Sequence, residues 1–265
     1  MQVPTVHLVV PTLGQRLDML DLALGSITDQ RDISIDLTVV AKQLSPALQT
    51  QCIRHGARLL EQSGSGMSQA INQGWSHSQR DSTYWAWLGD DDLLAPGALA
   101  AATQYLEDSR GTVMVFGRCL YIDEVGHPLW EARPTSAAVR LLRRGPDLVP
   151  QPGSVARASA IRQVGLLDEG LRFAMDLDLF IRLRSAGRID YLPRRLASFR
   201  WHTGSTTVSS LDQSIAEAAE VRRRHRQGPD GLSDRSLDYL AMLAGRALHR
   251  AQKFPARYLR PATDR

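Results

Sequence analysis

Apolar residues follow two alternating patterns along the first part of the chain. Short, mostly apolar runs such as residues 6–10 (VHLVV) have the length and composition of buried β-strands. From Leu17 to Ile27 the apolar residues then recur three or four positions apart, which predicts an amphipathic helix. The alternation continues, with strands predicted over residues 35–40, 57–60, 84–88 and 112–116 and helices over residues 46–55, 67–75 and 96–106.

Strands that alternate with helices at this spacing predict an α/β fold with a mainly parallel central sheet flanked by helices. Sheets of this kind bind ligands in the crevice at the carboxyl ends of their strands. We therefore expect ligand contacts in the loops that follow the predicted strands, at residues 11–16, 41–45, 63–68 and 89–94.

The second half of the chain has a less regular pattern. Extended segments are predicted over residues 151–156 and 196–201, a short helix over 158–164 and an amphipathic helix over 176–186. From residue 212 onward the pattern is helical and charged. We predict a domain over residues 1–210, with halves 1–117 and 118–210, and a C-terminal helical extension over residues 211–265.

Composition narrows the class of protein. Hydrophobic residues make up 43% and charged residues 23% of the chain, which is ordinary for a globular protein and excludes a fibrous or disordered one. The net charge of +4 is too small to argue for nucleic acid. Cys52 and Cys119 stand among apolar neighbours, so we expect neither a disulfide framework nor a zinc site. With no signal peptide or membrane span in evidence, we expect a cytoplasmic protein.

Three adjacent carboxylates, Asp90, Asp91 and Asp92, directly follow the predicted strand at residues 84–88. Adjacent carboxylates repel one another unless a cation or solvent offsets the repulsion. Mg²⁺ and Mn²⁺ prefer oxygen ligands and often combine one or two carboxylates with substrate phosphates. The residues alone leave open a metal and diphosphate site or a solvated acidic turn before the helix at Pro96.

A glycine-rich turn precedes the predicted helix at residues 67–75. Gly64 and Gly66 allow a close backbone approach and leave N–H groups available to an anion. Asn72 lies in the middle of the helix, where asparagine has a poor propensity. A flexible turn with Asn72 facing solvent is the alternative.

Several short motifs follow one another between Pro11 and Ser205. Pro11-Thr12 comes first, followed by residues 66–74 (GMSQAINQG) and residues 88–99 (LGDDDLLAPGAL). The second half adds residues 151–154 (QPGS), 164–169 (VGLLDE), 174–183 (AMDLDLFIRL) and 199–202 (FRWH) with Ser205. This ordered set resembles the family 2 glycosyltransferases, which have the Rossmann-like GT-A fold, and the resemblance covers roughly residues 5–207.

The resemblance implies an inverting transfer of a sugar from a nucleotide-diphosphate sugar, linked to UDP, GDP or dTDP, to an acceptor hydroxyl. A bound Mn²⁺ or Mg²⁺ would neutralise charge on the leaving diphosphate, and a carboxylate would take the hydroxyl proton. The resemblance also makes residues 1–117 the nucleotide-sugar half and residues 118–210 the acceptor half. The implied acceptor is a glycan or a lipid-linked molecule, as in the synthesis of surface polysaccharides or glycolipids.

Motif positions assign roles to individual residues. Asp176 is the implied base, with Asp178 as the fallback, and Met175 replaces the family's glutamate. An Asp that opens a helix is also an ordinary N-cap, and the two roles are compatible. Gly89 stands where many relatives have the first Asp of their Asp-x-Asp motif. The ligand set implied by the resemblance therefore relies on Asp91 and Asp92, with Asp90 as a shifted partner. The implied metal ligands are Asp90, Asp92 and His202, and the implied donor contacts are Pro11, Thr12, Arg16, Lys42, Gly66, Asn72, Asp90, Asp91 and His202.

Two other functions fit parts of the sequence. A nucleotidyltransferase can share an α/β nucleotide-binding core, although the loop at residues 11–16 (PTLGQR) is poor in glycine for holding a triphosphate. A non-catalytic sugar-nucleotide-binding protein is the second alternative, because Met175 replaces a carboxylate and Lys42 stands where relatives often have a base-contacting Asp.

The C-terminal region is rich in basic residues and leucines. Residues 222–226 (RRRHR) lie on one predicted helix, and further arginines follow up to Arg260. Such helices could lie against anionic lipid at the inner face of a membrane, could pack their leucines on the catalytic domain, or could form a homodimer contact.

Overall fold

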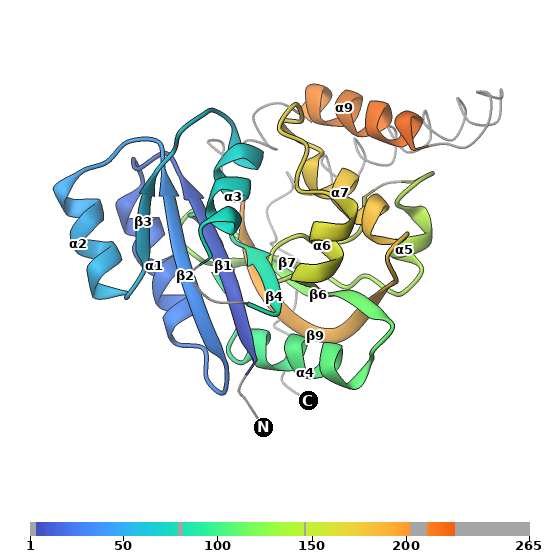
Figure 1. Ribbon diagram of the computed structural model, residues 1–265, viewed down its shortest axis with the longest axis horizontal. Helices are drawn as coiled ribbons and strands as arrows, with labels where there is room; N and C mark the ends of the chain where they lie inside the picture. The colour runs from blue at the N-terminus through green and yellow to red at the C-terminus, as the bar shows by residue number, and fades with distance from the viewer. Residues whose placement is uncertain (1–3, 79–81, 146, 202–210, 226–265) are drawn as a thin grey trace.

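The computed structural model of the protein describes residues 4–78, 82–145, 147–201 and 211–225. Within these residues, nine strands form one mixed sheet with helices packed on both faces (Figure 1). The strand order is β3-β2-β1-β4-β8-β6-β9-β5, and β7 pairs with β6. The strands are β1 Thr5–Thr12, β2 Ser34–Ala41, β3 Arg58–Glu61, β4 Tyr84–Trp87, β5 Leu93–Leu94, β6 Thr112–Ile122, β7 Pro128–Ala132, β8 Val155–Arg157 and β9 Arg188–Arg200.

The sheet separates two hydrophobic cores because side chains alternate between its faces. Leu8 and Val10 of β1 belong to one core with apolar residues of α1, α2 and α4, whereas Val9 belongs to the other with Trp75 and apolar residues of α6 and α7. All three β1 side chains are fully buried. The helices are α1 Leu17–Thr28, α2 Pro46–Arg54, α3 Met67–Ser76, α4 Ala98–Asp108, α5 Ala138–Leu141, α6 Ala158–Val164, α7 Met175–Leu183 and α9 Leu211–Arg224.

The first half of the sheet is parallel, as the alternating pattern predicts. β3, β2, β1 and β4 are parallel neighbours, and β1 lies between β2 and β4 with Val6 opposite both Ile35 and Tyr84. The predicted N-cap of α2 is confirmed, because Ser45 Oγ accepts a hydrogen bond of 3.1 Å from Leu48 N. Every strand and helix predicted before residue 110 is present within a few residues of its expected bounds.

The second half makes the sheet mixed rather than mainly parallel. β8 is antiparallel to both β4 and β6, and β7 forms an antiparallel hairpin with β6. β6 and β9 pair in parallel but are much longer than the predicted strands at residues 112–116 and 196–201. Gly117 explains part of this difference, because it interrupts the apolar run in the sequence. In the structure it lies within β6, where the Cβ of any other residue would come within 2.5 Å of Arg194 O.

The sequence predicts one boundary between residues 117 and 118 and another between residues 210 and 211. Residues 117 and 118, between the two predicted halves, both lie within β6, so this division stays a prediction. Of the predicted extension, α9 is described, and it packs against α7. The rest of it, residues 226–265, lies outside the described residues. In the described part of the chain, no helix combines the length and apolar character needed to cross a bilayer.

Candidate active site

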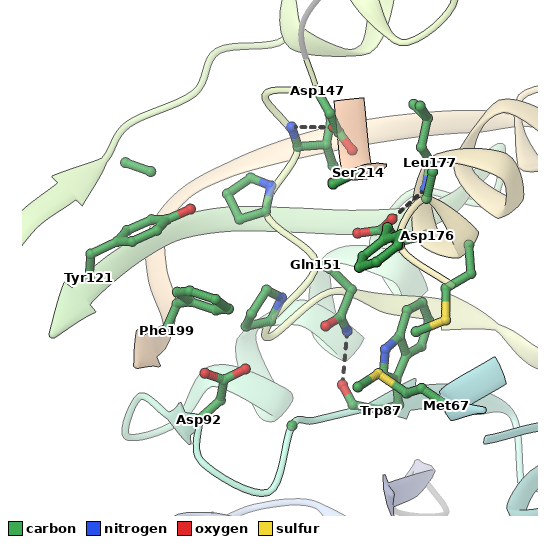
Figure 2. A pocket seen from close by; sticks show the side chains of 18 of the residues that line it. Met67, Trp87, Asp92, Tyr121, Asp147, Gln151, Asp176, Leu177, Phe199 and Ser214 are labelled. Atoms are coloured by element: carbon green, nitrogen blue, oxygen red, sulfur yellow. Dashed lines mark hydrogen bonds between the residues drawn. The ribbon is translucent and has the colours of Figure 1, made fainter. Parts of the chain in front are cut away.

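A pocket of about 540 Å³ lies at the carboxyl ends of β1 and β4, where they face the second half of the sheet. Pro11, Trp87 and the acidic triplet form one wall, and residues 147–152 and 172–177 form another. Figure 2 shows that Asp92, from the segment after β4, and Asp176, from α7, both border this pocket. The loops after β1 and β4 therefore contribute to it as the sequence predicts, together with α9 through Ser214 and Ala218.

Arg16 and Thr12 hold the first two carboxylates of the triplet. Arg16 donates from Nη2 to Asp90 Oδ1 and from Nη1 to Asp91 Oδ2, both at 2.9 Å. Thr12 Oγ1 donates to Asp90 Oδ2 at 2.6 Å. The loop after β1 thus supplies a positive charge and a hydroxyl to the segment after β4, and these contacts offset the repulsion between the two adjacent carboxylates.

Asp92 is the most deeply buried member of the triplet, with 4% of its surface exposed. Its Oδ1 accepts a hydrogen bond of 3.0 Å from Arg200 N, and Arg200 Nε donates to Asp91 O at 3.0 Å. Burial, followed by the negative charge of Asp91, raises the pKa of Asp92 well above its ordinary value. A cation placed beside Asp92 would stabilise its ionised carboxylate against burial and the neighbouring negative charges.

The triplet suits a hard divalent cation by its chemistry, since it offers only carboxylate oxygens beside an open pocket. In the described part of the chain, no group of three or more His, Cys, Asp or Glu side chains is arranged to hold a metal ion by itself. Mg²⁺ sites in general take one or two protein carboxylates and complete the shell with water and substrate phosphates. His202, the third predicted ligand, lies outside the described residues.

The glycine-rich turn and its helix contribute less to the pocket than the triplet does. Gly66 has a φ of +86° and precedes α3, and Met67 beside it lines the pocket. Lys42 Nζ donates to Gly64 O at 2.9 Å, which ties the loops after β2 and β3 together. Of the residues predicted to bind the donor or the metal, the described pocket lining includes Pro11, Arg16, Asp90, Asp91 and Asp92. It does not include Thr12, Lys42, Gly66 or Asn72.

Asn72 has a clear structural partner. It is buried, its Nδ2 donates to Leu167 O at 2.9 Å and to Glu169 Oε1 at 3.0 Å, and its Oδ1 accepts from Leu167 N at 3.1 Å. These bonds attach α3 to the turn that precedes α7. The alternative that Asn72 faces solvent is therefore wrong, because burial here is compensated by a full set of hydrogen bonds.

Asp176 lies in the first turn of α7 and lines the pocket. Its Oδ1 accepts a hydrogen bond of 2.8 Å from Leu177 N, while the N-cap position of the helix belongs to Ala174. The alternative of an ordinary N-cap therefore does not describe Asp176. Burial, followed by the negative charge of Asp147, raises the pKa of Asp176 to about 7.

Asp178, the fallback base, is held by other side chains. Arg182 Nη2 lies 2.7 Å from Asp178 Oδ2, and His225 Nε2 lies 2.7 Å from Asp178 Oδ1. Arg182 also donates to the carbonyl oxygens of Val164, Gly165 and Leu166 at the end of α6. Asp178 and Arg182 thus connect α6, α7 and α9, and neither belongs to the described pocket lining.

An aromatic wall, defined as Tyr121, Trp130, Phe199 and Trp201, closes the pocket on the side of β6, β7 and β9. Tyr121 and Trp130 stack with ring centroids 3.8 Å apart, and Tyr121 lies 5.2 Å from Phe199. Each of the four is partly exposed. Phe199 and Trp201 belong to the motif at residues 199–202, but nothing in the sequence places Tyr121 and Trp130 beside them, because these two rings come from β6 and β7.

Two arginines of the basic C-terminal run make contacts within the protein. Arg222 is buried and donates from Nε to Leu142 O at 3.3 Å, and Arg224 pairs with Glu220 at 3.2 Å. The remaining basic residues from Arg226 to Arg260 lie outside the described residues. Membrane contact and a homodimer accordingly stay predictions.

Comparisons with known proteins bear on the identity of this pocket. An uncharacterized glycosyltransferase of Rickettsia typhi is 23% identical over 223 residues, which cover 79% of this chain and 68% of that protein. A second, from Rickettsia prowazekii, is 24% identical over the same shares.

Solved structures resemble the fold. The mannosyltransferase PcManGT from Pyrobaculum calidifontis, in complex with GDP-Man and Mn²⁺, gives a TM-score of 0.68 at 14% identity and covers 95% of this chain and 74% of its own. S. aureus TarS 1–349, in complex with UDP-GlcNAc, gives 0.63 at 13% identity, with 89% and 71% covered. These likenesses confirm the predicted GT-A fold. The model of glycosyl transferase family 2 matches residues 8–165, more than half of the chain, and the protein therefore belongs to this family of glycosyltransferases.

Proposed function

We propose that the protein is an inverting, metal-dependent glycosyltransferase that transfers a sugar from a nucleoside diphosphate sugar to a hydroxyl of a carbohydrate acceptor, with Asp176 as the base. The observation that carries this proposal is one pocket of about 540 Å³ bordered by both the acidic triplet and Asp176. A transfer of this kind needs a site for a leaving diphosphate and a proton acceptor facing the same space.

The chemistry at Asp176 follows from its position and pKa. The acceptor oxygen attacks the anomeric carbon as the bond between that carbon and the diphosphate oxygen breaks. The hydroxyl proton passes to the Asp176 carboxylate, and the nucleoside diphosphate leaves with the bonding electrons. A pKa of about 7 supports this role, because a base is most effective when its pKa lies near the working pH.

The proposed donor class and metal are supported by the ligands of similar solved structures and by the residues of this chain. The solved relatives bind UDP-GlcNAc or GDP-Man, and one of them also binds Mn²⁺. In this chain, Asp92 and Asp90 are the proposed metal ligands, with His202 as a third. Arg16 is proposed to contact the diphosphate, and Asp91 is a further proposed donor contact. A bound divalent cation would offset the negative charge that develops on the departing diphosphate.

The aromatic wall supports a carbohydrate acceptor. Aromatic faces can stack on the apolar face of a sugar ring, while Gln151 and Asp176 offer polar atoms on neighbouring parts of the lining. Pro11 and Arg16, from β1 and the loop after it, line the same pocket and belong to the proposed donor side. A glycan, free or attached to a lipid, is therefore the proposed acceptor class.

Nucleotide release tests the proposal directly. The protein is incubated with Mn²⁺ and a panel of UDP-, GDP- and dTDP-sugars, and free nucleoside diphosphate is measured over time. We expect turnover of at least one donor, its loss in Asp92→Ala, and its loss with retained donor binding in Asp176→Asn. Absence of turnover with every donor overturns the function, and full activity of Asp176→Asn overturns the choice of base.

A further inference from the structure

Glu217 of α9 binds three successive backbone amides beside the pocket. Its Oε1 lies 3.0 Å from Arg172 N, and its Oε2 lies 2.5 Å from Phe173 N and 2.7 Å from Ala174 N. Ala174 is the N-cap residue of α7, and that helix has no side-chain cap of its own. Glu217 therefore supplies, from another helix, hydrogen-bond acceptors for the amide of the N-cap residue and for the two amides that precede it.

This contact fixes the backbone that carries Asp176. Asp176 follows Ala174 by two residues and is bonded to Leu177 N in the same helical turn. A displacement of the segment at residues 172–174 would therefore move the Asp176 carboxylate with it. The carboxylate of Glu217 is also favourable at this end of α7, because the helix dipole leaves a partial positive charge there.

The helix that carries Glu217 is itself attached to the catalytic domain. One to two turns beyond Glu217, buried Arg222 donates to Leu142 O and His225 lies 2.7 Å from Asp178 Oδ1. Ser214 and Ala218, on either side of Glu217 in sequence, line the pocket. The position of Glu217 is thus set by contacts that do not involve the segment it binds.

We propose that Glu217 is a positioning residue for sugar transfer, which holds the backbone at residues 172–174 and thereby aims Asp176 at the acceptor hydroxyl. The inference rests on the proposed role of Asp176 as the base. Glu217 is not among the described residues that line the pocket, so it acts through Asp176 rather than on the substrate. It also lies outside residues 8–165, which match the family.

The test compares Glu217→Ala, Glu217→Gln and the control Glu220→Ala in the full chain. Glu220 lies on the same helix, where it pairs with Arg223 and Arg224 at the surface. Nucleotide release with the donor panel and Mn²⁺ gives kcat and the donor KM. We expect Glu217→Ala to lower kcat by about 10- to 100-fold with the donor KM almost unchanged, because a misplaced catalytic group costs turnover rather than donor binding. Glu217→Gln, which keeps one acceptor oxygen, should recover part of the loss, and Glu220→Ala should behave as the unsubstituted protein.

Amide hydrogen exchange supplies a readout that does not depend on turnover. We expect the amides of Arg172, Phe173 and Ala174 to lose protection in Glu217→Ala and to keep it in Glu220→Ala. If Glu217→Ala does not fold, Glu217→Gln carries both measurements, and unchanged kcat together with unchanged exchange in that variant overturns the proposal.

The possible failures are distinguishable. If no donor is turned over, or if Asp176→Asn stays active, the proposed function or its base is wrong and the role of Glu217 falls with it. If Asp176→Asn is inactive while folded Glu217→Ala keeps its kcat, the inference about Glu217 alone is overturned. An equal loss in Glu220→Ala would also overturn it, because the effect would then belong to α9 as a whole.

Discussion

Asp176 shows how the surroundings of one residue can set its chemistry. Burial and the charge of Asp147 hold the pKa of its carboxyl group near 7, whereas an Asp in an unfolded chain has a value of 3.8. Below pH 7 the neutral acid predominates, and it cannot accept a proton from a hydroxyl. The same shift means that the folded state binds more protons than the unfolded chain between about pH 4 and pH 7.

This difference predicts two pH dependences. Donor turnover should rise as the pH passes upward through about 7, because Asp176 is then ionised. The stability contribution of protonated Asp176 is present below the unfolded pKa and is lost as the pH rises through the folded pKa. Melting temperatures measured from pH 4 to pH 8 should therefore fall less steeply with pH in Asp176→Asn. Some slope should remain, because Asp92 also has a raised pKa. Identical slopes in the two proteins would contradict the shift at Asp176.

At the scale of elements, the two halves differ in how far the sequence predicts them. Apart from the two-residue strand β5, the strands before residue 110 are short apolar runs bounded by turn residues, so their type is predictable and their bounds are predictable to within a few residues. β6 and β9 contain Gly117, Arg118 and Pro193, which break the apolar pattern, and their length depends on pairing with each other. β7 was missed for the same reason, because its stability comes from its hairpin with β6.

The attachment of α3 to the turn before α7 gives a prediction about stability. Asn72→Ala removes three hydrogen bonds and leaves both backbone polar groups of Leu167 without this partner. Buried groups left in this way cost about 1–3 kcal/mol, and the variant should unfold at a lower urea concentration. Ser76→Ala, an exposed change on the same helix, is the matched control and should stay within about 0.5 kcal/mol. Equal midpoints for the two variants would rule out the structural role of Asn72.

For the whole molecule, the pocket is the place where segments distant in sequence meet. Asp90, Asp91, Asp92 and Asp176 are conspicuous in the sequence because they stand in local motifs. Glu217 stands in no such motif, and of the aromatic wall only Phe199 and Trp201 do. The contacts of Glu217 with residues 172–174 and the stacking of Tyr121 on Trp130 exist only in the folded chain. Sequence patterns therefore predicted the residues proposed for the chemistry, and the structure added those proposed for positioning and for the acceptor.

The aromatic wall predicts a separation between donor hydrolysis and sugar transfer. Trp130 lines the pocket on the side proposed for the acceptor, so Trp130→Ala should weaken acceptor binding without changing how the donor binds. Loss of about 1 kcal/mol of ring contact corresponds to roughly a fivefold increase in acceptor KM. Transfer from the active donor to a panel of methyl glycosides is measured against hydrolysis by water. Val125→Ala, in the exposed turn of the same hairpin, is the control, and Trp130→Phe should restore most of the transfer because it keeps a ring. If Trp130→Ala changes hydrolysis and transfer by the same factor, the wall serves the donor or the fold, and the carbohydrate acceptor loses its main structural support.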